Sequence, residues 1–299
     1  MIRAEQLTRR FGPLVAVNQL DLVIARGEVF GLVGPDGAGK TTTLRLLTGL
    51  LDANGGRAVV AGFPVAEKPA EVRDRIGYMA QKFGLYGDLT VEENMDFYAD
   101  LFAVNPAELE PLKLRLLAMT RMAEFRGRPA AKLSGGMKQK LALMCTLLHK
   151  PRILLLDEPT NGVDPVSRRD FWIILDELVR EGMTLLVTTA YLDEAERCHR
   201  VGLMHHGRLI RVGTPAELKS AVPGDCYEVA APNARDLRTA LEGAPGVLSV
   251  KPAGAVLHVF LETNAVIPGV GGEWQRIQPT LEDVFVSVIG REPAHASQH

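Results

Sequence analysis

Short, fully apolar runs alternate along the chain with longer stretches in which apolar residues recur at helical spacing. The runs at residues 29–33, 153–156 and 184–187 contain almost no polar side chain. A strand of a parallel sheet is covered by helices on both faces, so it reads as a continuous apolar run without alternation. The pattern therefore predicts an α/β fold with a mainly parallel sheet, and residues 57–61 add a shorter strand.

Two of the longer stretches are predicted to be helices. One follows the first apolar run, over residues 40–50. The other covers residues 91–102, where apolar side chains at 91, 95, 98 and 102 form one face. Thr90 precedes this helix and Glu93 follows three residues later, which is the sequence of a capping box.

The pattern changes after Leu218, and residues 222–225, VPGD, read as a linker. We therefore expect a first domain over residues 1–220 and a small accessory α+β domain over residues 221–299. Within the second we expect strands at 226–230, 247–250 and 256–261, and helices at 234–241 and 281–289. Residues 291–299 are expected to fray.

Composition excludes several classes of protein. The 299 residues are 46% hydrophobic and 23% charged, as in an ordinary globular protein, and the net charge of −2 gives no reason to expect a nucleic-acid partner. The three cysteines have no metal-ligand spacing. No apolar run reaches the roughly 18 residues that span a bilayer, and the N-terminus has no signal-peptide core. We expect a cytoplasmic protein that reaches a membrane only through a partner.

A glycine-rich sequence follows the first apolar run. Residues 34–41, GPDGAGKT, match G-x-x-x-x-G-K-[ST]. Glycines let backbone N–H groups turn toward a phosphate, and the next helix adds partial positive charge. Lys40 can reach the β- and γ-phosphates, and the Thr41 hydroxyl can bind Mg²⁺. The residues expected to bind the nucleotide are Gly34, Pro35, Asp36, Gly37, Ala38, Gly39, Lys40, Thr41 and Thr42.

Two acids, Asp157 and Glu158, follow the apolar run at 153–156. Buried carboxylates are unfavourable unless they are paired or bind a metal, and the carboxyl end of a parallel strand is where open α/β sheets bind ligands. We expect Asp157 to hold Mg²⁺ through water and Glu158 to polarise an attacking water.

A second anion site is predicted at residues 133–140, LSGGMKQK, where Ser134 caps a helix and two glycines expose its first N–H groups. Two phosphate-binding ends in one chain suggest that two chains enclose nucleotide between them. Here the sequence resembles the ATP-binding-cassette (ABC) family, whose signature is LSGGQ; Met137 takes the place of glutamine. The resemblance covers roughly residues 2–220.

The resemblance implies a P-loop NTPase of the ABC type, with a parallel core sheet, an antiparallel β part and a helical subdomain that carries the signature. It implies that Phe11 stacks on adenine and that Gln81 contacts Mg²⁺ and the attacking water. Glu158 and Gln81 are then the catalytic residues, and Thr41, Gln81 and Asp157 the metal-binding ones. The residues that contact nucleotide from the signature are Ser134, Gly135, Gly136 and Met137.

One position departs from the family pattern. A switch histidine usually follows the strand that ends at residues 187–189, and here that position is Ala190. A histidine can bond the γ-phosphate, whereas alanine cannot, and loss of such a donor typically costs about 10²–10³ in rate. Two interpretations stay open: an altered but working site, or slow hydrolysis with ATP acting mainly as a dimerisation switch.

Two segments point to partners. Phe83, Leu85, Tyr86 and Leu89 lie where ABC proteins receive a coupling helix of the membrane subunit, although packing inside the helical subdomain would also explain them. The run at 278–285, QPTLEDVF, resembles an ending of drug- and antibiotic-exporter cassettes.

The sequence therefore favours an ATPase that powers an ABC multidrug or antibiotic exporter. Its expected partners are ATP, Mg²⁺, a second cassette, identical or not, and an integral membrane permease at the inner face of the cell membrane. The alternatives are a hydrolysis-impaired regulatory module and a non-transport ABC ATPase. Against the last, only about fifty residues without heptads separate Gln81 from Ser134.

Overall fold

The structure, a computed structural model, describes residues 1–269 and 271–289. Two compact units divide between Arg211 and Val212. We expected the first domain to end at residue 220, and this domain boundary stays a prediction. Residues 291–299, which we expected to fray, lie outside the described residues.

The core of the first unit is a six-stranded sheet in the order β10-β9-β3-β8-β7-β6. The pairs β9–β3, β3–β8, β8–β7 and β7–β6 are parallel, and every residue of β3, β7 and β8 is buried, which explains their unbroken apolar runs. The strands are β3 (Val29–Val33), β6 (Ile76–Met79), β7 (Ile153–Asp157), β8 (Thr184–Thr189), β9 (Arg200–His205) and β10 (Arg208–Gly213).

A four-stranded sheet in the order β2-β1-β4-β5 forms the antiparallel part, and its inner side chains join the core of the parallel sheet. Only β4 corresponds to a strand expected from the apolar pattern. The strands are β1 (Ile2–Phe11), β2 (Leu14–Ile24), β4 (Gly55–Val60) and β5 (Phe63–Pro64).

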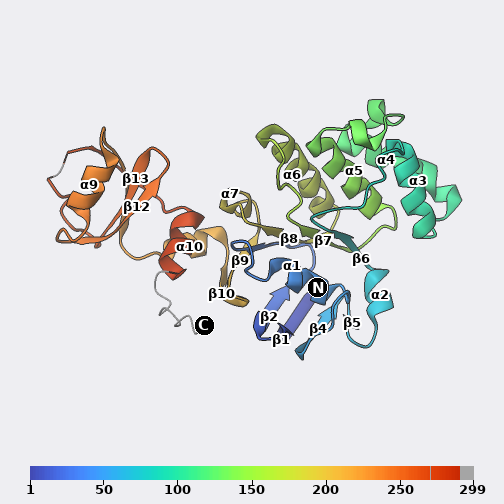
Figure 1. Cartoon of the computed structure of the whole chain (residues 1–299), viewed down its shortest axis with the longest axis horizontal. Coiled ribbons are helices and arrows are strands. Elements are labelled where there is room, and N and C mark those ends of the chain that lie inside the picture. Colours follow the sequence, from blue (N-terminus) through green and yellow to red (C-terminus); the bar gives the residue numbers. More distant parts are fainter. Residues whose placement is uncertain (270, 290–299) are drawn as a thin grey trace. The chain divides into compact units, whose positions relative to one another are not determined.

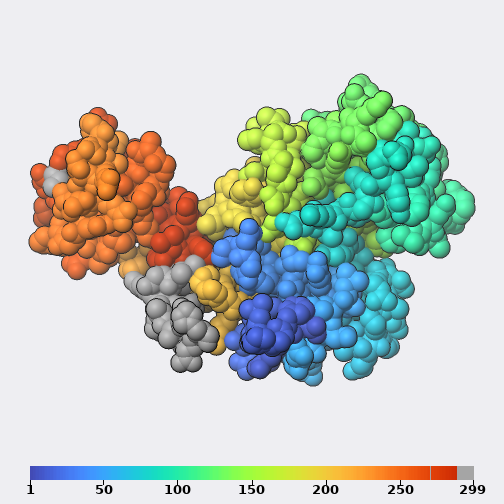
Figure 2. Space-filling view, in the orientation of Figure 1, coloured from blue at the N-terminus to red at the C-terminus, as the bar shows by residue number. Residues whose placement is uncertain are grey.

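Helices cover the parallel sheet, and α3, α4 and α5 gather into a helical subdomain, cyan to green in Figures 1 and 2. The capping box of Thr90 and Glu93 at the start of α3 is confirmed, whereas the first helix ends at Leu47 rather than near residue 50. The helices are α1 (Lys40–Leu47), α2 (Pro69–Arg73), α3 (Val91–Leu101), α4 (Pro106–Thr120), α5 (Gly135–Leu147), α6 (Pro165–Arg180) and α7 (Leu192–Ala195), with 3₁₀ turns at Ala123–Phe125 and Ala130–Lys132.

The second unit contains an antiparallel sheet in the order β12-β13-β11-β14 with its own apolar core. The expected strands and helices of this α+β unit are confirmed, with the edge strand β14 and helix α8 in addition. The elements are α8 (Pro215–Ser220), β11 (Asp225–Ala230), α9 (Ala234–Leu241), β12 (Val247–Ala253), β13 (Val256–Leu261), β14 (Glu273–Ile277) and α10 (Leu281–Ile289). Among the described residues, no helix has the length and apolar content needed to cross a bilayer.

Candidate nucleotide-binding site

The glycine-rich loop connects β3 to α1 and has room for glycine alone at two positions. A Cβ on Gly34 would lie 2.1 Å from the backbone oxygen of Met204. A Cβ on Gly39, whose φ is +105°, would lie 2.3 Å from the backbone oxygen of Ala16. Gly39 is also the N-cap of α1, and no side chain caps this helix. The first turn therefore presents backbone N–H groups and partial positive charge toward the loop.

Lys40 begins α1 and is almost completely buried beneath the loop. Its Nζ donates hydrogen bonds to the backbone oxygens of Gly34 (2.7 Å) and Pro35 (3.0 Å). It also forms an ion pair with Glu158, with 3.1 Å between Nζ and Oε1. All three protons of the ammonium thus have acceptors. An anionic ligand in the loop would compete with these acceptors for the ammonium.

Thr41 and Asp157 bring two oxygen ligands together at the end of β7. The Thr41 hydroxyl donates to Oδ1 of Asp157 at 3.0 Å, and the Thr188 hydroxyl donates to the same oxygen at 2.8 Å. Parallel pairing of β7 with β8 places Thr188 directly beside Asp157. Burial raises the pKa of Asp157 above its ordinary value, while the two hydroxyl donors oppose that rise.

Glu158 is held in an unusual backbone conformation, with a φ of +48°. Its N–H donates to the backbone oxygen of Thr188 at 3.1 Å. Its Oε2 accepts hydrogen bonds from Nε2 of Gln81 (2.9 Å) and Nδ2 of Asn161 (3.2 Å). Positive φ at a non-glycine residue is typically unfavourable by about 1–3 kcal/mol and is common at functional sites. The hydrogen bonds to Glu158 therefore hold in place a carboxylate that is largely buried.

Lys40, Thr41 and Glu158 line one cavity of about 580 Å³, whereas Asp157 is buried and does not line it. Most residues expected to bind nucleotide from this side are present, together with Gln81 and Glu158, and Phe11 lies at the rim with 45% of its surface exposed. Sequence reasoning missed the part of the wall that comes from β2 and from the turn after β9. The lining residues are Phe11, Leu14, Val15, Ala16, Asp36, Gly37, Ala38, Gly39, Lys40, Thr41, Thr42, Gln81, Glu158, His206 and Gly207.

The signature residues do not line this cavity within the described part of the chain. Ser134 is the N-cap of α5, and its Oγ accepts a hydrogen bond from the Met137 N–H at 3.3 Å. Ser134 and Gly135 are exposed, whereas Gly136 is packed so closely that an added Cβ would lie 2.5 Å from Cβ of Ser167. The helix tip predicted to bind an anion is thus formed, but it does not line the cavity beside the glycine-rich loop of its own chain.

Ala190 lines a smaller hollow of about 150 Å³ beside Glu158, together with Asp36, Thr160, Asn161, Thr189 and Tyr191. Its methyl group supplies no hydrogen-bond donor. Behind it, buried Glu194 accepts a hydrogen bond from the Thr189 hydroxyl at 2.9 Å and another from the Thr160 hydroxyl. The sequence motifs gave Thr160 and Thr188 no role in the site, because these residues are brought to it by the pairing of β7 with β8 and by the following loop.

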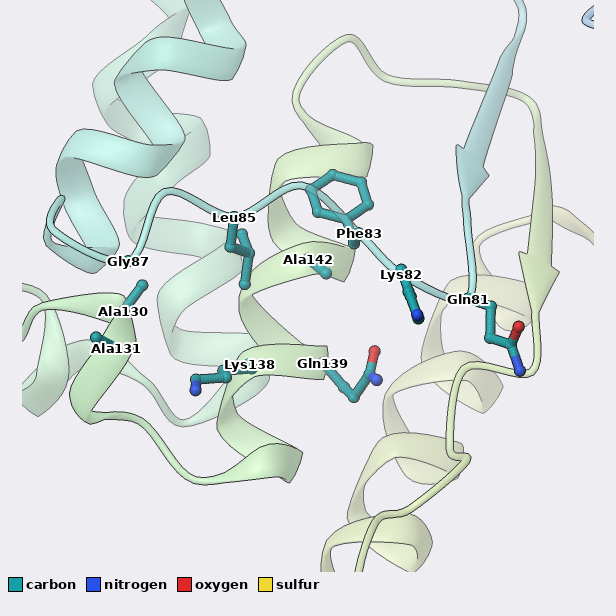
Figure 3. Close-up of a pocket in the computed structure, with 10 residues that line it drawn as sticks. All are labelled: Gln81, Lys82, Phe83, Leu85, Gly87, Ala130, Ala131, Lys138, Gln139 and Ala142. Atoms are coloured by element: carbon teal, nitrogen blue, oxygen red, sulfur yellow. The ribbon is translucent and has the colours of Figure 1, made fainter.

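Figure 3 shows a groove of about 350 Å³ between the loop after β6 and helix α5. Lys82, Phe83 and Leu85 come from the loop, and Lys138 stands across from them on α5. Of the aromatic and aliphatic residues expected at this surface, Phe83 and Leu85 line the groove. Tyr86 is exposed and packs edge-on against Phe97, with 4.5 Å between the ring centroids. Gln81 lines both this groove and the nucleotide cavity.

Three features define the class of protein: a glycine-rich loop, a lysine beneath it, and a strand that ends in two carboxylates. Together they are typical of a P-loop protein that binds nucleoside triphosphates. Comparison with known proteins narrows the class, because a family model described as ABC transporter matches residues 17–161. The chain belongs to the ABC transporter family as an ATP-binding protein, and the cassette fold expected from the sequence is confirmed.

Several relatives support this assignment. A probable multidrug ABC transporter ATP-binding protein, YbhF of Escherichia coli, is 44% identical over 92% of this chain, which spans only 49% of YbhF. The Nod factor export ATP-binding protein I of Burkholderia thailandensis is 36% identical over 96% of both chains. A daunorubicin resistance ATP-binding protein of Streptomyces coeruleorubidus is 37% identical over 97% of this chain and 95% of its own length.

Solved structures of ABC cassettes have the same fold. An ATP-binding subunit of an ABC transporter aligns with a TM-score of 0.67 and 29% identity, over 74% of this chain and 92% of its own. A dimeric ATP-binding cassette bound to ADP and Pi aligns with a TM-score of 0.65 and 25% identity, over 72% of this chain and 98% of its own.

Proposed function

We propose that this chain hydrolyses ATP as the ATP-binding subunit of a membrane exporter for drug- or antibiotic-like compounds. The observation that carries the proposal is the convergence of Lys40, Thr41, Gln81 and Glu158 on one cavity beside the glycine-rich loop, with buried Asp157 hydrogen-bonded to Thr41. The names of the relatives, which are multidrug, Nod factor and daunorubicin ATP-binding proteins, support export as the process that is powered.

Mg²⁺ fits the oxygen ligands at the end of β7. Thr41 offers a hydroxyl and Asp157 a carboxylate, 3.0 Å apart, and hard oxygen ligands of this kind suit the ion. Gln81, whose Nε2 donates to Glu158, would offer its amide oxygen from the neighbouring loop. When bound with the nucleotide, the ion would neutralise charge that develops on the phosphates. A divalent cation would also relieve the unfavourable burial of the Asp157 carboxylate.

The ion pair of Lys40 suggests how nucleotide binding could prepare hydrolysis. Lys40 is paired with Glu158 in the structure. A triphosphate in the loop attracts the Lys40 ammonium through stronger, charge-assisted bonds, which frees one oxygen of Glu158. Gln81 and Asn161 keep the other oxygen in place. Glu158 can then accept a bond from water and orient it toward the γ-phosphate.

The exposed signature helix supports a dimer in which each chain completes the nucleotide site of the other. Ser134 and Gly135 are exposed at the tip of α5, outside the cavity of their own chain. We propose that these N–H groups and the Ser134 hydroxyl bind the γ-phosphate held by a second cassette. The related dimeric cassette bound to ADP and Pi is consistent with such an assembly.

The test uses the Glu158→Gln variant, in which slow hydrolysis should trap the ATP-bound dimer. Light scattering after size exclusion should report a dimer with ATP and a monomer with ADP. The matched control adds Ser134→Asp, because aspartate caps a helix as well as serine does but repels phosphate. This double variant should stay monomeric with ATP. A monomer for Glu158→Gln itself, or a dimer for the control, would contradict the shared site.

We place the permease at the groove of Figure 3. Apolar Phe83 and Leu85 can receive an apolar side chain of the permease, and Lys82 and Lys138 favour an acidic residue beside it. Anchoring through this groove would hold the chain at the inner face of the membrane. Phe83→Asp should then abolish co-purification with a co-expressed multi-span permease while leaving basal phosphate release unchanged.

Ala190 supports a second candidate, a nucleotide-dependent regulatory module without useful turnover. Among residues 1–269 and 271–289, no histidine lines the hollow beside Glu158 to bond the γ-phosphate. Steady-state phosphate release separates the two functions. An ATPase must be faster than its Glu158→Gln variant, whereas equal rates would support the regulatory module.

A further inference from the structure

Three buried side chains with metal-ligating atoms meet in the second unit, apart from the nucleotide site. Cys226 lies on β11, His258 on β13 and Asp283 on α10, and one ligand atom from each lies within 4.8 Å of the others. Their residue exposures are 2%, 7% and 4%. Residues 1–269 and 271–289 contain no other group of three or more such side chains at this spacing.

The fold itself brings the three together. In the antiparallel pairing of β11 with β13, Cys226 stands opposite Phe260, so His258, two residues along, projects from the same face of the sheet. Asp283 is positioned by the start of α10. Its Oδ2 accepts hydrogen bonds from the N–H of Thr280 (2.9 Å) and from the Thr280 hydroxyl (2.8 Å). The same oxygen lies 2.9 Å from Nδ1 of His258.

We propose that Cys226, His258 and Asp283 form a binding site for a divalent transition-metal ion of the zinc class. A thiolate, an imidazole and a carboxylate are the donor types that zinc prefers, whereas Mg²⁺ and Ca²⁺ prefer oxygen alone. Zinc bonds of about 2.0–2.3 Å place tetrahedral ligand atoms roughly 3.5 Å apart. Ligand atoms up to 4.8 Å apart therefore need to move inward by roughly 1 Å, and Nδ1 of His258 and Oδ2 of Asp283, now 2.9 Å apart, need to separate slightly; side-chain rotation can supply both.

The charges around the site also suit a divalent ion. Thiolate and carboxylate together carry two negative charges, which the ion balances. The nearby cation, Lys251, donates to the backbone oxygen of Asp283 at 2.8 Å and lies over the Phe260 ring, 4.8 Å from its centroid. The ammonium is thus bound by groups other than the three ligands.

Three protein ligands leave one tetrahedral position for water, as in open zinc sites rather than closed structural ones. The ion is therefore exchangeable. Because its ligands come from β11, β13 and α10, its binding would lock the last helix of the unit onto the sheet. We assign the site a regulatory role, in which the metal supply sets the rigidity of the second unit.

The experiment titrates the full-length, chelator-treated protein with Co²⁺, a spectroscopic substitute for zinc. We expect one equivalent to bind with a thiolate-to-cobalt charge-transfer band, and Zn²⁺ to displace it. Cys226→Ser should lose the band and bind roughly tenfold more weakly or worse. Cys145→Ala, which removes a buried thiol of the first unit, should keep both properties.

His258→Gln provides a second test that does not alter the thiol, in case Cys226→Ser fails to fold by circular dichroism. This variant should weaken Co²⁺ binding by a similar factor. Absence of binding, or equal affinity in the wild type and His258→Gln, would overturn the proposal. Binding without a thiolate band would also overturn it, because the adjacent imidazoles of His205 and His206 would then be the ligands.

Discussion

Replacing Lys40 by methionine removes one half of the buried ion pair while keeping a long, flexible side chain. The side chains of Lys40 and Glu158 are only 4% and 10% exposed. Breaking a buried pair by removing one partner typically costs about 3–5 kcal/mol, because the remaining charge stays buried. Two amide donors still bond Glu158, so we expect the nucleotide-free protein to lose about 1–3 kcal/mol of unfolding free energy.

A double-mutant cycle separates the charge effect from lost packing. Glu158→Gln removes the charge that Lys40→Met leaves without a partner. The double variant should therefore be more stable than the sum of the two single changes implies, by about 1–2 kcal/mol. The same Lys40→Met change should weaken ATP binding roughly 100-fold or more, because about two charge-assisted bonds to phosphate are lost.

Urea unfolding followed by tryptophan fluorescence can report on the first unit alone. The chain has two tryptophans: Trp172, buried in α6, and Trp274 in β14 of the second unit. In a Trp274→Phe background, the signal comes from Trp172. Lys138→Met, the same change at an exposed lysine on α5, should leave the midpoint unchanged. Additive effects of the Lys40 and Glu158 changes, or unaltered ATP affinity, would refute the reasoning.

Three further changes test other parts of the molecule. Ala190→His restores a donor beside Glu158 and should raise steady-state phosphate release roughly tenfold or more; an equal or lower rate would show that another step limits turnover. A hydrogen bond from Arg126 lowers the pKa of Glu92 from 4.5 to about 2, so its stabilising effect is present above pH 4.5 and is lost as the pH falls toward 2. Glu92→Gln should therefore cost about 1 kcal/mol at neutral pH, after allowance for solvent screening. The difference from wild type in urea unfolding should shrink as the pH falls from 4.5 to 2, and a constant difference would contradict the ion pair. Gly136→Ala places a Cβ 2.5 Å from α6 and should destabilise by about 1–3 kcal/mol in the same assay, whereas Gly135→Ala, with its nearest atom at 3.9 Å, should have a smaller effect; equal effects would count against the close packing.

The sequence predicted the buried parallel strands well because their environment is uniform. β3, β7 and β8 are covered on both faces, so each appears in the sequence as an apolar run, and a buried strand is the simplest explanation of such a run. β1 and β2 were not found from the pattern. Both contain a residue with positive φ, Gln6 at +49° and Gln19 at +48°, and their pairing shifts register between Ala4 and Arg10. Such bulges break the two-residue alternation on which strand prediction depends.

The candidate site also contains residues that the sequence alone reveals and residues that only the fold brings in. Lys40, Thr41, Asp157 and Glu158 lie in local motifs whose chemistry can be recognised without coordinates. Thr188 cannot be recognised in this way, because only the register of β8 against β7 puts its hydroxyl on Asp157. Ser134 shows a different limit, since its helix tip is correctly predicted but the structure of one chain does not bring it to a nucleotide.

Gln81 belongs to the wall of two hollows, one beside the glycine-rich loop and one beside α5. If the second hollow receives a permease, any movement of Gln81 that its docking causes must alter the hydrogen bond to Glu158. Thermodynamic reciprocity then applies. If the docked permease changes the affinity for nucleotide by some factor, nucleotide changes the affinity for the permease by the same factor. A single amide would thus let each half of a transporter sense the occupancy of the other.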